Sequence, residues 1–229
     1  MSELSHDPIG QPAAPGRRTK NDAIARRDRF INDQLTGLVK EDLVVNVGCG
    51  MVRRFEVDTP GRYLATDLRA LSNVDFSSDA TALPLADDSV DAVVCLELLE
   101  HVPEPKSVLA ELARILRPGG TVLISVPSAV PRHDDHDFWR FTAEGLERLC
   151  SEFFPGGKVE VFGGTFEALG YLGFYYLSLV LHRVGIKGRA LADALPATGH
   201  WLDEHNSWST STSALHTLAF DLLFVGKAS

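Results

Sequence analysis

The feature that most limits how this chain can fold is an alternation, from residue 43 onward, of short apolar runs with longer amphipathic segments. Runs rich in β-branched and aliphatic residues are typical of strands that a sheet buries on both faces. Strands are therefore predicted at residues 43–48, 62–68, 90–96, 121–128, 158–164 and 215–228. Amphipathic helices are predicted at residues 105–116, closed by Arg-Pro-Gly-Gly, and 142–154. The alternation indicates an α/β fold whose parallel sheet is covered by helices on both faces.

The chain of 229 residues is expected to form one large domain. Residues 1–20 are rich in Pro, Gly, Ala and polar residues and are expected to be a flexible arm, so that residues 21–229 form the domain. Before the last strand, residues 165–213 interrupt the alternation with an apolar helix and a polar loop. An insertion this apolar is expected to cover the mouth of the active site, to contact the partner in a homodimer, or to cover a lipid-like substrate.

A helix is expected over residues 21–38, with Asn21 or Asp22 as its N-cap. It carries three arginines that are expected on a solvated face: Arg26, Arg27 and Arg29. The alternative for these arginines is contact with an anionic substrate group or with a partner.

The net charge of −9 argues against a surface that binds nucleic acid or anionic lipid, because both need positive charge. The chain has three cysteines: Cys49, Cys95 and Cys150. Their odd number and their spacings match no metal or disulfide framework, so reduced thiols in the cytoplasm are predicted. The most apolar stretch, residues 168–181, is shorter than the roughly 20 residues that span a bilayer. A soluble cytoplasmic protein is expected, with peripheral membrane attachment through that stretch as the alternative.

Gly48-Cys49-Gly50 follows the first predicted strand, where glycines let the backbone approach a ligand at the carboxyl end of a sheet. Asp67 ends the second strand, where a carboxylate can accept hydrogen bonds from both hydroxyls of a ribose. A dinucleotide site favours a third glycine at position 53, which is Arg53 here. S-adenosylmethionine (SAM) has no pyrophosphate and does not require that glycine.

Four successive segments then decide between these two ligands by resemblance. VVNVGCG, ATDL, SDATALPLADDSVDAVVCLELLEHV and LRPGGTVLISVP resemble, in this order and spacing, the motifs of class I SAM-dependent methyltransferases. The likeness is greatest to small-molecule methyltransferases of the ubiquinone and menaquinone type. It implies a Rossmann-like, doubly wound sheet of seven mostly parallel strands, with the last strand antiparallel, and SAM as the cofactor.

The resemblance also implies roles for individual residues. Gly48, Cys49 and Gly50 would line the methionine part of SAM, Asp67 would hold the ribose, and Leu68 would pack on the adenine.

Two further pairs complete the cofactor residues that the resemblance implies. Asp79 would accept a hydrogen bond from the adenine amino group with Ala80 alongside, and Leu96 and Glu97 would flank the sulfonium and methionine.

Two positions depart from the family pattern, which usually has an acid in place of Asn46 and often a glycine in place of Val52. Asn46 can still make hydrogen bonds at the cofactor site. A SAM-binding module without turnover is the alternative from another class of function.

The loop after the strand predicted at residues 121–128 carries the candidate catalytic groups. His133 or His136, oriented by a neighbouring carboxylate, would serve as the general base for methylation of a hydroxyl. The alternatives are a Mg²⁺-type site built from Asp134, Asp135 and a histidine, or a solvated polar loop. His101 is a further candidate base, although a structural hydrogen bond is the favoured role for it.

Residues 137–142 resemble a segment of methyltransferases associated with sugar pathways, and Thr142 is a natural N-cap for the next helix. Phe138 and Trp139 are expected in the core, with stacking on a sugar as the alternative. The sequence thus predicts methyl transfer to a hydroxyl of a small molecule, with a saccharide or glycoside favoured. The alternative is N- or C-methylation of a natural-product or quinone-type acceptor.

Overall fold

The computed structural model describes residues 23–50, 62–183 and 221–229. Their strands form one seven-stranded sheet in the order β3-β2-β1-β4-β5-β7-β6. The strands are β1 (Leu43–Val47), β2 (Arg62–Asp67), β3 (Phe76–Ser77), β4 (Val90–Leu96), β5 (Leu116–Pro127), β6 (Lys158–Phe162) and β7 (Asp221–Lys227). The helices are α1 (Ala23–Leu35), the 3-10 turn η1 (Leu99–His101), α2 (Pro105–Ile115), α3 (Ala143–Ser151) and α4 (Thr165–Arg183).

The sheet confirms the predicted fold class. Neighbouring strands from β3 to β5 pair in parallel, whereas β7 lies antiparallel between β5 and β6. The last strand is therefore the reversed one, as the resemblance implied. Its first residue, Asp221, pairs with Pro127 and Phe162, the last residues of the two strands beside it.

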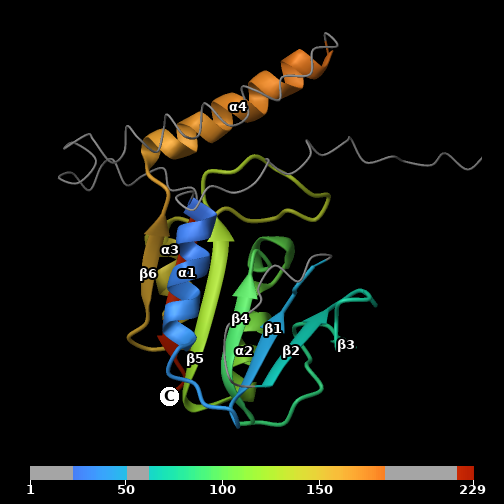
Figure 1. Ribbon diagram of the computed structural model, residues 1–229, viewed down its shortest axis with the longest axis vertical. Coiled ribbons are helices and arrows are strands. Elements are labelled where there is room, and N and C mark those ends of the chain that lie inside the picture. The colour runs from blue at the N-terminus through green and yellow to red at the C-terminus, as the bar shows by residue number, and fades with distance from the viewer. Residues whose placement is uncertain (1–22, 51–61, 184–220) are drawn as a thin grey trace, which may run out of the picture.

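Helices cover both faces of the sheet (Figure 1). On one face Ile31 and Leu35 of α1 pack with a smaller apolar cluster from the central strands. On the other face a larger cluster joins the sheet to α2 and α3 through side chains such as Leu109, Leu112 and Leu146. The central strands are thus shielded on both sides, which explains the nearly continuous burial of β1, β4 and β5.

One edge of the sheet collects the chain segments that carry the candidate site residues. The strands β1, β2, β4, β5 and β6 end at this edge, and β7 begins there. Figure 1 shows the loop after β5 and the helix α4 beyond this edge. In open α/β sheets, ligands bind outside the carboxyl ends of the strands.

Most element boundaries shift by a few residues from the predictions, and two differences have a clear physical reason. Helix α2 ends at Ile115, and Leu116 already pairs with Val90 as the first residue of β5. The reason is that Arg117 precedes Pro118, and the residue before a proline is forced out of the helical conformation. The two-residue strand β3 is too short to leave a periodic pattern, and it was not predicted.

Several expectations concern residues outside the described ranges. They are the N-terminal arm, the two candidate N-cap residues of the first helix, residues 51–61 with Val52, and residues 184–213 of the insertion. The described part of the insertion is α4, whose Glu167 accepts hydrogen bonds from the Ala23 amide at 3.0 Å and from Arg26 at 2.8 Å. Among the helices described, none is long and apolar enough to cross a membrane.

Candidate functional site

The turn after β1 is built on two glycines in the left-handed region, Gly48 with φ 72° and Gly50 with φ 68°. The amides of Gly48 and Cys49 donate to the Thr66 carbonyl at 2.9 and 3.0 Å, which fastens the turn to the end of β2. A Cβ at position 48 would lie 2.9 Å from both methyl carbons of Leu98, whereas one at position 50 would meet nothing within 4 Å. The turn therefore packs against the chain on one side and opens onto space on the other.

The Asp67 carboxylate lies beside this turn, as the sequence predicts. Its Oδ2 accepts a hydrogen bond from the Gly50 amide at 2.9 Å, and its Oδ1 accepts from the amide of Arg69 at 3.0 Å and from its Nε at 3.2 Å. Asn73 donates to the Gly50 carbonyl at 3.0 Å. The turn and the carboxylate thus form one connected unit at the ends of β1 and β2, and Asp67 is 8% exposed.

Two other expected cofactor residues lie next to this unit. Asn46 is buried in β1 and donates to the Tyr63 hydroxyl at 2.8 Å, so its amide is held by β2. Leu68 follows Asp67 directly and is 72% exposed. A large apolar side chain exposed to this degree beside a polar turn is suited to covering the flat face of a ring.

Asp79 and Ala80 lie beyond β3, and the Asp79 side chain is exposed. Its Oδ1 accepts hydrogen bonds from the amide and the hydroxyl of Thr81, both at 2.8 Å, and these bonds lower its pKa. The carboxylate is therefore charged near neutral pH and can accept a further hydrogen bond. Ala80 is half-buried and packs against the core.

Glu97 follows Leu96 at the carboxyl end of β4 and has the left-handed φ of 53°, which is uncommon for a residue other than glycine. Its Oε1 accepts hydrogen bonds from Ser125 Oγ at 2.8 Å and from Arg27 Nη1 at 3.1 Å. Glu97, which is expected beside the methionine of SAM, is therefore also part of a hydrogen-bond network of neighbouring side chains.

The expectation that all three N-terminal arginines lie on a solvated face is wrong for Arg27, which is 3% exposed. Arg27 donates to Asp221 through a short hydrogen bond, and to Asp28 and Glu97. The physical reason is the packing of α1 on the sheet, because position 27 lies on the buried face of the helix, in the series Ala23, Arg27, Ile31 and Leu35.

Two buried acids beside this network lack full hydrogen bonding within the described part of the chain. Asp221 Oδ1 and both carboxylate oxygens of Glu100 have no hydrogen-bond partner. Burial, followed by the charge of Glu97, raises the pKa of Glu100 to about 9. The same two causes raise the pKa of Asp221, against the opposing effect of Arg27.

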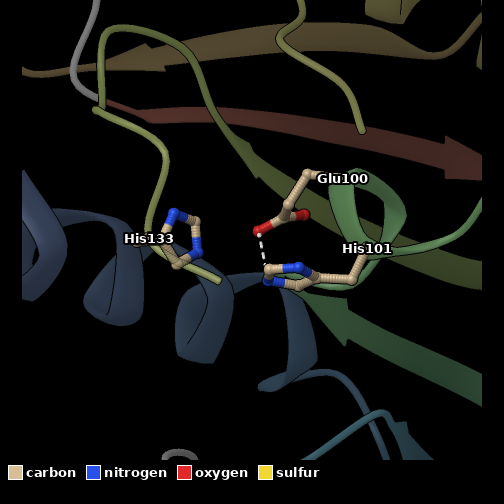
Figure 2. Close-up of side chains that lie close together, drawn as sticks. All are labelled: Glu100, His101 and His133. Atoms are coloured by element: carbon tan, nitrogen blue, oxygen red, sulfur yellow. Dashed lines mark ion pairs between the residues drawn. The ribbon is translucent and has the colours of Figure 1, made fainter. Parts of the chain in front are cut away.

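The structure brings His133 together with His101, which lies in η1 four residues after Glu97 (Figure 2). Their rings meet edge to face with centroids 5.0 Å apart. His101 Nε2 lies 3.6 Å from Glu100 Oε1. The exposed ring of His136 lies instead beside Phe138, with centroids 6.1 Å apart, and only its carbonyl reaches this group, by accepting a hydrogen bond from His101 Nδ1 at 2.7 Å.

The loop that carries His133 is fixed by an ion pair between Asp137 and Arg140. The Asp137 carboxylate, whose side chain is fully buried, accepts hydrogen bonds from Arg140 and from the His133 amide. Burial alone would raise the pKa of Asp137, but these contacts bring it below its usual value. Arg140 also donates to the carbonyls of Val130 and Pro131, so the loop closes on itself around one guanidinium.

A hollow of about 370 Å³ lies on this loop and is lined by Phe138, Trp139, Arg140 and their neighbours. Phe138 is 48% exposed and Trp139 is 44% exposed, so the expectation that they fill the core is wrong. Backbone and side-chain bonds hold them at the surface, since Phe138 N donates to the Glu100 carbonyl at 2.7 Å and Trp139 Nε1 to the Val102 carbonyl at 2.9 Å.

Three residues can offer ligand atoms to a single metal ion: Glu100, His101 and His133. Their ligand atoms lie within 4.8 Å of one another. This group does not contain Asp134 or Asp135, the carboxylates expected to hold Mg²⁺, both of which are exposed on the loop.

Comparison with known proteins bears on this arrangement. Residues 44–124, which contain the glycine turn, Asp67 and Glu100, match the family described as methyltransferase domain. The structure superposes with a TM-score of 0.54 on Haemonchus contortus phosphoethanolamine N-methyltransferase 2 in complex with SAM, at 12% identity over 88% of this chain and 52% of that chain. Residues 44–124 are thus similar to a methyltransferase domain, and the sheet has the fold of this solved methyltransferase.

Curated relatives share the methyltransferase motifs over short stretches. A ubiquinone biosynthesis O-methyltransferase from Cupriavidus pinatubonensis is 34% identical over 111 residues, covering 41% of this chain and 44% of the relative. A demethylmenaquinone methyltransferase from Renibacterium salmoninarum is 47% identical over 58 residues, covering 25% and 24%. The chain thus spans less than half the length of these relatives.

Three residues at this edge of the sheet were not assigned to the site from the sequence: Arg27, Glu100 and Asp221. The four-residue spacing of Arg27 with buried apolar residues was a usable signal, because the helical period places it on their face. Glu100 and Asp221 had no such signal, since their burial depends on distant segments. The three cysteines all lie within the described residues, are buried and form no disulfide there, and burial raises the pKa of Cys150 to about 12.

Proposed function

We propose that this chain transfers the methyl group of SAM to a hydroxyl of a small aromatic acceptor of the quinol type. The single observation that supports SAM most directly is the unit formed by the left-handed glycine turn and the buried Asp67 carboxylate. This unit opens onto space beside Gly50 and is flanked by the exposed Leu68, which fits an adenosyl group. The methionine would extend along Gly48 and Cys49 toward Glu97.

A hydroxyl acceptor is supported by the histidines at the carboxyl edge. Methyl transfer to oxygen moves the sulfonium methyl to the acceptor oxygen, releases S-adenosylhomocysteine and requires that the hydroxyl proton be taken up. His133 and His101 lie side by side and can accept that proton, whereas the His136 ring lies away from them. An amine acceptor would need such a group less.

The acceptor class is supported by two observations. The names of the curated relatives refer to ubiquinone and menaquinone compounds, which favours a quinone-type acceptor over the saccharide that the sequence suggested. The half-exposed rings of Phe138 and Trp139 line a hollow on the loop that carries His133, and aromatic faces of this kind pack well on a planar ring.

We also propose that the insertion covers the acceptor. Helix α4 begins beyond the carboxyl edge of the sheet (Figure 1) and is tied to α1 through Glu167. It exposes three large apolar side chains: Leu169, Tyr176 and Val180. A surface of this kind would shelter a reaction that must exclude water.

The experiment is a methyl-transfer assay with labelled SAM over catechols, hydroquinones, phenols, saccharides and amines, read by mass spectrometry of products and of S-adenosylhomocysteine. Methylated catechol or hydroquinone is the expected product. SAM uptake without turnover on any acceptor would support the binding module instead, and a methylated saccharide or amine alone would contradict the acceptor class.

Histidine variants test the proposed base in the same assay. His133→Ala and His101→Ala are expected to lower turnover by about 10²- to 10⁴-fold while SAM binding is kept, because each removes a proton acceptor. His136→Ala is expected to have a much smaller effect, since the contact that this residue makes to His101 comes from its backbone carbonyl. Equal losses in all three variants would contradict the assignment.

A further inference from the structure

We propose that Glu100, His101 and His133 form a binding site for one divalent transition-metal ion of the Zn²⁺ type. The three side chains come from η1 and from the loop after β5, and they point toward a common space (Figure 2). Two imidazoles and one carboxylate with an open position are the ligand set of many zinc sites.

The strongest support is the state of Glu100. Its side chain is 0% exposed, and neither carboxylate oxygen has a hydrogen-bond partner among the described residues. His101 Nε2 lies 3.6 Å from Glu100 Oε1. A carboxyl group buried without partners is costly, and buried charges are normally paired or coordinate metals. A cation between Glu100 and the histidines would supply the missing partner.

His101 is oriented as metal ligands usually are, and the tautomer of His133 decides whether its Nε2 is open to an ion. His101 Nδ1 lies 2.7 Å from the His136 carbonyl, which can only accept, so Nδ1 carries the proton and Nε2 is left with its lone pair. His133 Nδ1 lies 3.3 Å from Asp137 Oδ2. Arg140 Nη2 lies 3.4 Å from the same nitrogen and donates to it in the tautomer whose proton is on Nε2, whereas the tautomer with the proton on Nδ1 faces Asp137 and leaves Nε2 to an ion.

This arrangement leaves Nε2 of His101 to bind an ion while its Nδ1 donates to an oxygen acceptor, and Asp137 holds the backbone of His133 in place. Such outer contacts fix the tautomer and the ring orientation in known metal sites. Asp137 in turn forms an ion pair with Arg140, so a second residue of the loop helps to fix the position of His133.

The ligand types select the ion. Mg²⁺ takes oxygen ligands and keeps several waters, whereas imidazole favours Zn²⁺, Fe²⁺ or Co²⁺. The proposed ion therefore differs from the Mg²⁺ that the sequence suggested for Asp134 and Asp135. Ligand atoms now lie up to 4.8 Å apart, and bonds of about 2.1 Å need about 3.4 Å between ligands. Movement of the exposed His133 toward Glu100 would close this difference.

The metal site would serve the proposed function. Only its role in the reaction, and not the binding of the ion, rests on that function. A hydroxyl oxygen bound at the open position loses its proton more readily, because the ion stabilises the oxygen anion. The proton passes to water, the oxygen bonds to the methyl carbon, and the bond from that carbon to sulfur breaks. In that case His101 and His133 act as ligands rather than as free bases.

The test is metal binding by the full chain after removal of metal with EDTA, in the absence of SAM and acceptor. Calorimetry with Zn²⁺ and absorption spectra with Co²⁺ are expected to show one site per chain, with the visible bands of a four- or five-coordinate ion. Glu100→Gln and His133→Ala are each expected to weaken the affinity for Zn²⁺ by at least about 10-fold. The matched control His136→Ala is expected to bind as the wild type does.

The inference is overturned if the wild type binds no ion at this stoichiometry, or if His133→Ala binds as tightly as the control. His133 is exposed on a loop, so this variant is informative even if Glu100→Gln fails to fold. SAM binding is measured separately on the same preparations. Zn²⁺ binding without SAM binding would refute the proposed function alone, and SAM binding without Zn²⁺ binding would refute the inference alone.

Discussion

At the scale of single residues, two left-handed positions shape the cofactor edge in different ways. Gly48 needs both its φ of 72° and the absence of a side chain, because Leu98 fills the space where a Cβ would lie. Glu97 has a φ of 53° without being a glycine, and its carboxylate is held by Ser125 and Arg27. Backbone strain of this kind is common at functional sites, where the surrounding structure maintains it.

Gly48→Ala tests whether position 48 requires a glycine. The new methyl group would meet both Leu98 methyl carbons at 2.9 Å in a backbone conformation that alanine disfavours. A loss of about 1–3 kcal/mol in the free energy of unfolding is expected from urea denaturation. Gly37→Ala is the matched control, because a Cβ there meets nothing within 4 Å. Equal stability of the two variants would contradict this account of the turn.

At the scale of elements, α1 is part of the carboxyl edge rather than a separate surface helix. Its buried Arg27 connects α1 to the end of β4 through Glu97 and to the start of β7 through Asp221. Its N-terminal residue Ala23 is tied to α4 through Glu167. The first helix, the last strand and the insertion are thus joined around the place proposed for the methionine of SAM.

Arg27→Met tests the buried connection. Removing the guanidinium leaves Asp221 and Glu97 facing one another without a cation, and breaking a buried ion pair in this way costs about 3–5 kcal/mol. Urea denaturation is expected to show this loss, while the exposed control Arg29→Met is expected to change stability by less than about 0.5 kcal/mol. Adding Asp221→Leu to Arg27→Met is expected to restore part of the loss. A double variant less stable than Arg27→Met would contradict the pairing.

At the scale of the whole molecule, the sequence predicted what depends on local order. The strands and the pairing of the glycine turn with Asp67 follow from apolar periodicity and from short connections between parallel neighbours. The N-cap role of Thr142 is confirmed, since its hydroxyl accepts from the Gly145 amide at 3.0 Å.

What the sequence could not predict depends on segments far apart in the chain. Arg27 and Asp221 are separated by 194 residues, and no local pattern joins them. His133 meets His101 and Glu100 only because the loop after β5 folds back on η1, where the Phe138 amide bonds the Glu100 carbonyl. The loop reads as a line of mostly polar residues, and that pattern does not predict the contact with η1.

The most direct test of the central claim is calorimetric titration of the full chain with SAM. Binding at one SAM per chain is expected for the wild type and for the control Asp87→Asn, whose carboxylate pairs with the distant Arg114. Asp67→Ala is expected to bind SAM about 10- to 100-fold more weakly, because each charge-assisted hydrogen bond to the ribose contributes about 1.5–3 kcal/mol. A wild-type chain that takes up no SAM, or an Asp67→Ala chain that binds it as tightly as the control, would contradict the account.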